Sequence, residues 1–273
     1  MVKRVLLFTI ILLLAMGLQA QTIGRKSQLN VLQDCRVKSL EEFTERFNGN
    51  EVPDFIKNSP VPQNRRTYVA ALVNTDFLET DKGNPAVAEG FVDAVATSNR
   101  MVSMFDSNCY AEAHCLFAYK GKEIELSLML QLEKIREYYY KWSIVGVNGL
   151  VEAGLIPQLE DGYISPLQHE FHFDDLRNAF PHVGSCCYAN TTVDQLSCLI
   201  ALCESGVLKY KDCVQNDYFF FEIPGYVFLV SQKNRQDCNS GWLISNIMVV
   251  PDHEKEALIE ILLGKVKQNV KQK

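Results

Sequence analysis

Residues 123–133 read Glu-Ile-Glu-Leu-Ser-Leu-Met-Leu-Gln-Leu-Glu, with an apolar side chain at every even position from Ile124 to Leu132. The positions between them are mostly polar. Successive side chains of a β-strand point to opposite faces, so this alternation is typical of a strand with one buried face and one solvent-exposed face. The pattern predicts one long strand across the whole segment.

Two more strand-like segments flank this one. Residues 111–119 come before it, across the hairpin turn Lys120-Gly121. Residues 138–147 follow it and are rich in the aromatic and β-branched residues that strands favour. We therefore expect a meander of three antiparallel strands between residues 111 and 147.

Helix signals precede the meander. Ser39 and Glu42 are spaced as a capping box, in which a hydroxyl and a carboxylate satisfy amide groups at a helix start. Asn64 is placed to open a second helix, and Asn84 followed by Pro85 is placed to open a third. Helices and antiparallel strands in separate runs predict an α+β fold, with helices packed on long curved antiparallel sheets.

The second part of the chain repeats the order of helices followed by strands. Predicted helices lie at 174–180, from a capping box at Thr192 to Gly206, and after Asp252. Predicted strands lie at 218–223, 226–231 and 242–250. The predicted organisation is a signal peptide at 1–20, an α+β domain at 21–150, a connection at 151–165 and a second α+β half at 166–273.

The amino terminus has the pattern of a secretory signal peptide. Lys3 and Arg4 precede an apolar run from Val5 to Leu14. This run is too short for a hydrocarbon core of about 30 Å, which needs about 20 apolar residues. Small residues near Ala20 permit cleavage before Gln21. We expect export to the periplasm or the extracellular space, and an uncleaved amino-terminal anchor is the alternative.

Charge narrows the classes of partner. The chain carries a formal net charge of −6, and loss of residues 1–20 removes only the two cations Lys3 and Arg4. Without a basic stripe to displace counterions from phosphates, nucleic-acid binding is not expected. No second apolar stretch is long enough to span a membrane, so no membrane-spanning segment is expected after cleavage of the signal peptide. Glycine-rich phosphate loops are absent, and no cofactor is predicted.

Nine cysteines are an odd number, so at least one thiol is free or is bonded to another chain. Cys213 and Cys238 fall in segments that look polar and loop-like, and they are the better disulfide candidates. Zinc binding is disfavoured, because there is no Cys-x-x-Cys pair and the adjacent Cys186 and Cys187 present two ligands poorly. No metal site is predicted.

Three segments, 42–49, 141–147 and 165–173, resemble a family of uncharacterised exported bacterial proteins. The order of elements over residues 35–150 also resembles the nuclear-transport-factor-like (cystatin-like) α+β cone, with a looser likeness over 165–265. The resemblance implies export and a cone-like fold, with the possibility of two such halves. It implies no activity, because the cone fold hosts isomerases, dehydratases and plain binding modules.

One group of side chains is a candidate for catalysis. His169, Glu170 and His172 lie close in sequence, and on a helix the two histidines would share one face. They are candidates for a general base with a carboxylate that orients it. The spacing differs from the His-Glu-x-x-His motif of zinc proteases, and an acidic helix start explains the same residues structurally.

Aromatic residues supply a candidate ligand surface. Alternation sends Tyr138, Tyr140 and Trp142 to one face of their strand and Tyr139 to the other. Such side chains combine a large contact area with a polar tip, and they either line a ligand pocket or pack within a sheet.

These patterns favour a non-enzymatic module of the cell envelope that binds a small ligand or an envelope protein. The alternative is an isomerase, dehydratase or hydrolase that uses the His/Glu pair in a pocket. A third hypothesis is an interaction subunit that is held to its partner by the odd cysteine.

Overall fold

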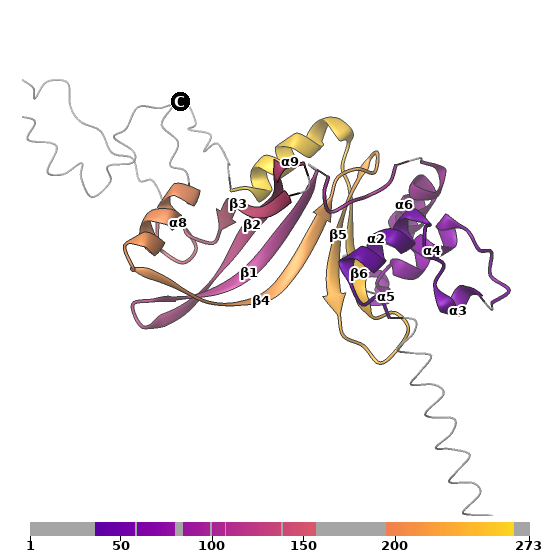
Figure 1. The fold of residues 1–273 in the computed structure, drawn as a ribbon, viewed down its shortest axis with the longest axis horizontal. Coiled ribbons are helices and arrows are strands. Elements are labelled where there is room, and N and C mark those ends of the chain that lie inside the picture. The colour runs from indigo at the N-terminus through magenta and orange to yellow at the C-terminus, as the bar shows by residue number, and fades with distance from the viewer. Residues whose placement is uncertain are drawn as a thin grey trace, which may run out of the picture. The chain divides into compact units, whose positions relative to one another are not determined.

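The computed structural model describes residues 36–57, 59–79, 84–98, 100–106, 108–137, 139–156 and 195–264. Its six strands are β1 (Cys109–Tyr119), β2 (Lys122–Arg136), β3 (Tyr139–Asn148), β4 (Leu208–Phe220), β5 (Tyr226–Lys233) and β6 (Gly241–Val249). Within the described residues these strands form one antiparallel sheet in the order β3-β2-β1-β4-β5-β6 (Figure 1). Together with the helices, the sheet confirms the predicted α+β class.

The predicted meander is present as β1, β2 and β3. Lys120 and Gly121, at φ 48° and 78°, make the hairpin turn between β1 and β2 in the left-handed conformation that a tight hairpin requires. In the register of that hairpin Cys115 faces Leu126 and His114 faces Ser127. The alternation in the sequence therefore marks two distinct faces of the sheet.

Strand β4 is longer than the sequence predicts. The prediction began at Tyr218, whereas the strand begins at Leu208. Most side chains between these two residues are exposed, so the segment lacks the apolar alternation by which a strand is recognised. Cys213 accordingly lies in a strand, and the prediction that it occupies a loop is wrong.

The described residues of the amino-terminal part form five helices, three of which begin where capping residues predict. They are α2 (Leu40–Asn48), α3 (Asp54–Lys57), α4 (Arg65–Leu72), α5 (Thr75–Glu79) and α6 (Pro85–Thr97). Ser39, Asn64 and Asn84 each accept a hydrogen bond from a backbone N–H in the first turn of α2, α4 and α6, respectively. The same residues that mark helix starts in the sequence thus satisfy amide groups that the helix leaves unpaired.

Among the described residues after β3, two helices are present, α8 (Gln195–Glu204) and α9 (Lys255–Leu262). The final helix was predicted to begin after Asp252, but residues 252–254 form a 3₁₀ turn first. The predicted helix at 174–180 lies outside the described residues. Among the helices that are described, none is both long and apolar enough to cross a lipid bilayer.

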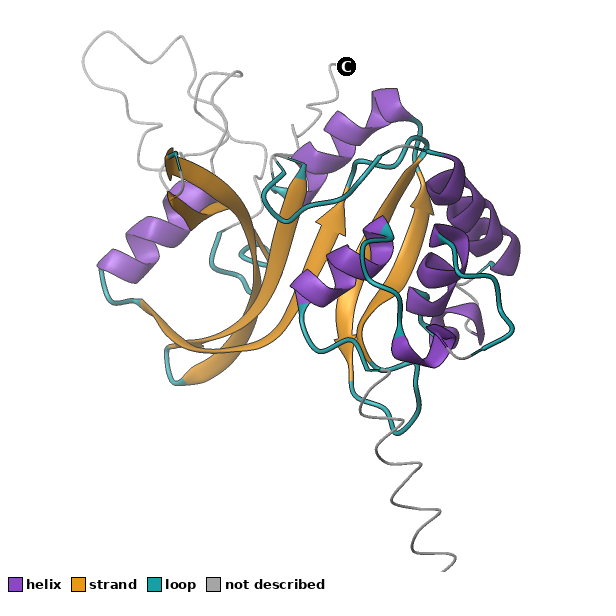
Figure 2. Ribbon diagram, turned by 45° about the vertical axis from the view of Figure 1, so that its right-hand side comes forward, coloured by secondary structure: helices purple, strands orange, loops and turns teal. Residues whose placement is uncertain are grey.

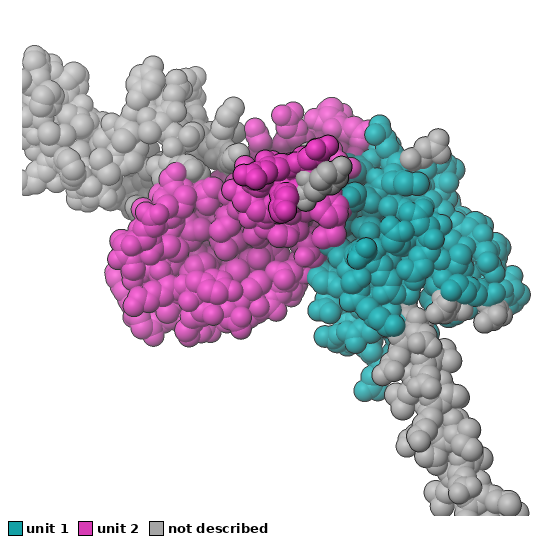
Figure 3. Space-filling view, in the orientation of Figure 1, with its two compact units in different colours: residues 1–103, 220–250 teal, residues 104–219, 251–273 magenta. Residues whose placement is uncertain are grey.

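The chain divides into two compact units, drawn in separate colours in Figure 3. Unit 1 comprises residues 1–103 and 220–250, and unit 2 comprises residues 104–219 and 251–273. Each unit draws on two separate segments of the chain. The core of unit 1 is aromatic, with the rings of Phe47 and Phe220 each stacked 5.1 Å from that of Phe228.

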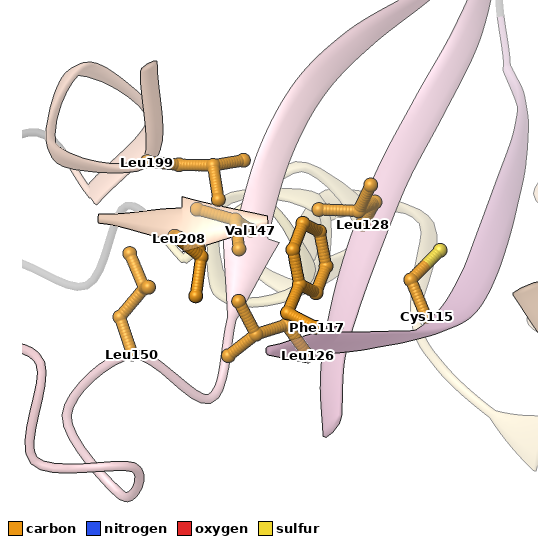
Figure 4. Packing of buried hydrophobic residues seen from close by; sticks show 8 residues of the cluster. All are labelled: Cys115, Phe117, Leu126, Leu128, Val147, Leu150, Leu199 and Leu208. Carbon is orange, nitrogen blue, oxygen red and sulfur yellow. The ribbon is translucent and has the colours of Figure 1, made fainter. Parts of the chain in front are cut away.

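Unit 2 is built on the long, curved strands β1 to β4 (Figure 2). One face of these strands carries an apolar cluster whose buried members are shown in Figure 4: Cys115, Phe117, Leu126, Leu128, Val147, Leu150, Leu199 and Leu208. Leu199 comes from α8, so this helix covers the apolar face. Helix α9 ends against β3, where the side-chain amide of Asn148 donates to the carbonyl oxygen of Leu262 over 2.7 Å.

Candidate functional site

The candidates His169, Glu170 and His172 lie outside the described residues. The two disulfide candidates are both described. Cys238 is disulfide-bonded, and Cys213 is a free thiol. The described residues offer two other sites, one on each face of the sheet in unit 2.

The first site is an aromatic surface on the face that also carries the apolar cluster. In the register between β2 and β3, Tyr140, Trp142 and Ile144 of β3 lie opposite Lys134, Leu132 and Leu130, respectively. Leu130 packs against the apolar cluster, so all three β3 side chains share its face. This agrees with the alternation that the sequence predicts for Tyr140 and Trp142.

Two more rings join these side chains. The ring of Phe105 lies 5.0 Å from that of Tyr140, and the ring of Tyr218 on β4 lies 6.2 Å from that of Trp142. We call the set of Phe105, Tyr140, Trp142, Ile144 and Tyr218 the aromatic face. Neighbouring strands are about 4.8 Å apart, so the backbones of β3 and β4, with two strands between them, are about 14 Å apart. Rings that meet across this span require a face that curves inward.

The aromatic face is only partly buried. Trp142 keeps 37% of its surface exposed and Tyr140 keeps 38%. Burial raises the pKa of the Tyr218 phenol, and the neighbouring Cys109 and Cys213 raise it further. The phenol therefore stays protonated and can donate a hydrogen bond. A surface with several partly exposed rings is suited to an apolar ligand.

The second site lies on the opposite face, around His114. Its Nδ1 atom lies 3.3 Å from the Oγ atom of Ser127 and 3.5 Å from a carboxylate oxygen of Glu125. Its Nε2 atom lies 3.5 Å from Oδ2 of Asp217 and 4.0 Å from a carboxylate oxygen of Glu112. We call these five residues the polar cluster.

Asp217 is the most buried member of the polar cluster, with 5% of its surface exposed. Its Oδ2 atom accepts a hydrogen bond of 2.7 Å from the side chain of Gln215. Its Oδ1 atom is buried and has no hydrogen-bond partner. A buried carboxylate oxygen without a donor costs free energy, and such groups are found where a protein binds or reacts.

A hydroxyl, an imidazole and a carboxylate that contact one another in this order can transfer a proton from one group to the next. Ser127, His114 and Asp217 provide these groups, so the arrangement suits general acid–base chemistry. Over the described residues, histidine, cysteine and acidic side chains form no group of three or more arranged to hold a metal ion.

The polar cluster does not follow from the patterns in the sequence. Alternation alone places His114 and Ser127 on the wet face of a hairpin, which was a usable signal. Asp217 reaches them only because β4 runs beside β1, and the amino-terminal part of β4 was not predicted.

Comparisons with known proteins place the chain in no group. No family model matches the sequence, and no curated protein or solved structure matches it either.

Proposed function

We propose that this chain is an exported, non-enzymatic binding module of the cell envelope, and that it binds an apolar ring-bearing ligand on the aromatic face. The observation that carries the proposal is Trp142, whose ring lies 6.2 Å from that of Tyr218 while more than a third of its surface stays exposed. Aromatic side chains in a core have their whole surface in contact with other residues, whereas part of the Trp142 side chain is still free to contact a ligand.

Export is supported by the amino-terminal pattern of two cations and an apolar run. The disulfide at Cys238 adds to this support, because disulfides persist in oxidising compartments such as the periplasm. The inward-curving aromatic face also favours a nuclear-transport-factor-like cone in unit 2. The described parts of the two predicted halves, residues 21–150 and 166–273, each combine helices with antiparallel strands, which favours the hypothesis of two such halves.

The binding proposal can be tested with the dye 8-anilinonaphthalene-1-sulfonate, which fluoresces on apolar surfaces. We expect saturable binding to the folded chain, weakened about fivefold by Trp142→Ala and by Tyr140→Ala, because each removes about 1 kcal/mol of ring contact. The matched control is Tyr139→Ala, on the opposite face of the same strand and 70% exposed. Equal dye binding by all three variants contradicts the proposal.

A second candidate function is hydrolysis or isomerisation by proton transfer at the polar cluster. It is favoured by the contacts of His114 and by the unpaired Oδ1 atom of Asp217. Hydrogen bonds of catalytic groups are often long before substrate binds, so the distances of 3.3 and 3.5 Å fit this role.

The probe for this activity is p-nitrophenyl acetate. We expect the chain to hydrolyse it faster than free imidazole does, and we expect His114→Gln to lower the rate about 100-fold. The matched control is His253→Gln, because His253 is a highly exposed histidine away from the cluster. Equal rates for the two variants exclude catalysis by His114 on this substrate.

A further inference from the structure

Two thiols lie side by side within unit 2, on the neighbouring strands β1 and β4. Cys115 is a buried member of the apolar cluster, and Cys213 packs against that cluster. The Sγ atom of Cys213 donates to the carbonyl oxygen of Gln215 over 3.5 Å and to Oδ1 of Asn216 over 3.1 Å. It also lies close enough to Cys115 to raise the pKa of that thiol. Both thiols are free in this structure.

Side-chain contacts between β1 and β4, before and after the two cysteines, show that the two strands lie side by side at these thiols. The ring of Phe117 lies 5.7 Å from that of Tyr210, and Nε2 of His114 lies 3.5 Å from Asp217. On β1, Cys115 lies between His114 and Phe117. On β4, Cys213 lies between their contact partners Tyr210 and Asp217. Facing residues of antiparallel strands have Cα atoms about 4.5–5.5 Å apart, which lies within the range of a disulfide bond.

An irregularity of β4 turns Cys213 toward its neighbour. Leu208 and Cys213 both contact the apolar cluster although they are five residues apart. In a regular strand, residues at this spacing point to opposite faces. The alternation therefore shifts by one residue between them, and the shift places Cys213 on the face of Cys115.

We propose that Cys115 and Cys213 form a reversible disulfide bond that joins β1 to β4. The oxidant is a low-molecular-weight disulfide, such as oxidised glutathione. Two protein S–H bonds and the S–S bond of the reagent break, one protein S–S bond forms, and the reagent leaves as two thiols. The protein sulfurs are oxidised and the reagent is reduced.

The order of the two steps follows from burial. Cys213 is half-buried, whereas Cys115 is buried. Burial raises the pKa of the Cys115 thiol to about 12, with further contributions from the charge and hydrogen bond of Cys213 and from Asp212. Cys213 therefore attacks the reagent first. Once Cys213 is held in the mixed disulfide, Cys115 loses its proton, attacks the sulfur of Cys213 and releases the second thiol.

The experiment is a peptide map of the purified chain after incubation with oxidised glutathione. Remaining thiols are alkylated under denaturing conditions, and the protein is cut with glutamyl endopeptidase without reduction. Cleavage after Glu112 separates Cys109 from Cys115, and cleavage after Glu204 and Glu222 leaves Cys213 alone in its peptide. We expect one species that joins residues 113–123 to residues 205–222 and that disappears on reduction.

Full alkylation of Cys115 after oxidation, or its linkage to any other cysteine, overturns the proposal. The map uses the unaltered chain, so it does not depend on the folding of a variant. In addition, oxidation should raise the melting temperature by several degrees, because the bond constrains a long loop of the unfolded chain. Cys213→Ser should lose this rise, and Cys203→Ser, which alters an exposed thiol on α8, should keep it. A rise that survives Cys213→Ser also overturns the proposal.

Discussion

Phe228 lies at the centre of the aromatic core of unit 1. Its ring stacks on Phe47 and Phe220 and tilts against Phe91 at 5.2 Å, and none of its surface is exposed. We expect Phe228→Ala to lower the free energy of unfolding by about 3–5 kcal/mol, because the cavity cannot collapse between stacked rings. Urea denaturation measures the loss. Val249→Ala, at an exposed position of β6, should change it by less than about 0.5 kcal/mol.

At the scale of elements, Gly146 allows α9 to approach β3. A Cβ atom at this position would lie 2.6 Å from the carbonyl oxygen of Leu263 and 2.7 Å from its Cα atom. We expect Gly146→Ala to displace the end of α9, to destabilise the protein by about 1–3 kcal/mol, and to speed amide hydrogen exchange in α9.

The matched control for this change is Gly121→Asn in the hairpin turn. No atom lies within 4 Å of the position of its Cβ atom, and asparagine tolerates the left-handed backbone there. Unchanged exchange in α9 of Gly146→Ala would show that the close backbone approach is not needed.

The elements that the sequence predicts best are those with a strong local signal. The meander follows from strict alternation in β2, and the helix starts follow from the caps at Ser39, Asn64 and Asn84. The first part of β4 has no such signal, because most of its side chains are exposed and they do not alternate between apolar and polar. The polar cluster depends on that strand, so local patterns alone could not assemble it.

At the scale of the whole molecule, export predicts a processed amino terminus. We expect the protein recovered outside the cytosol to begin near Gln21, because the proposed signal peptide would direct export and then be removed. Intact mass and amino-terminal sequencing measure this. Leu12→Arg should retain the full-length chain inside the cell, whereas Val61→Arg, at an exposed position, should be processed normally. An unprocessed terminus on the unaltered protein contradicts the proposed compartment.

The two compact units interleave along the chain, and this has a consequence for the timing of folding. Unit 1 includes residues 220–250 and the described part of unit 2 includes residues 251–264, so neither is complete until synthesis nears its end. Domains that are continuous in sequence fold one after another as they leave the ribosome. This polypeptide instead stays without either finished core for most of its translation, which would suit the proposed export, since secretion channels take unfolded chains.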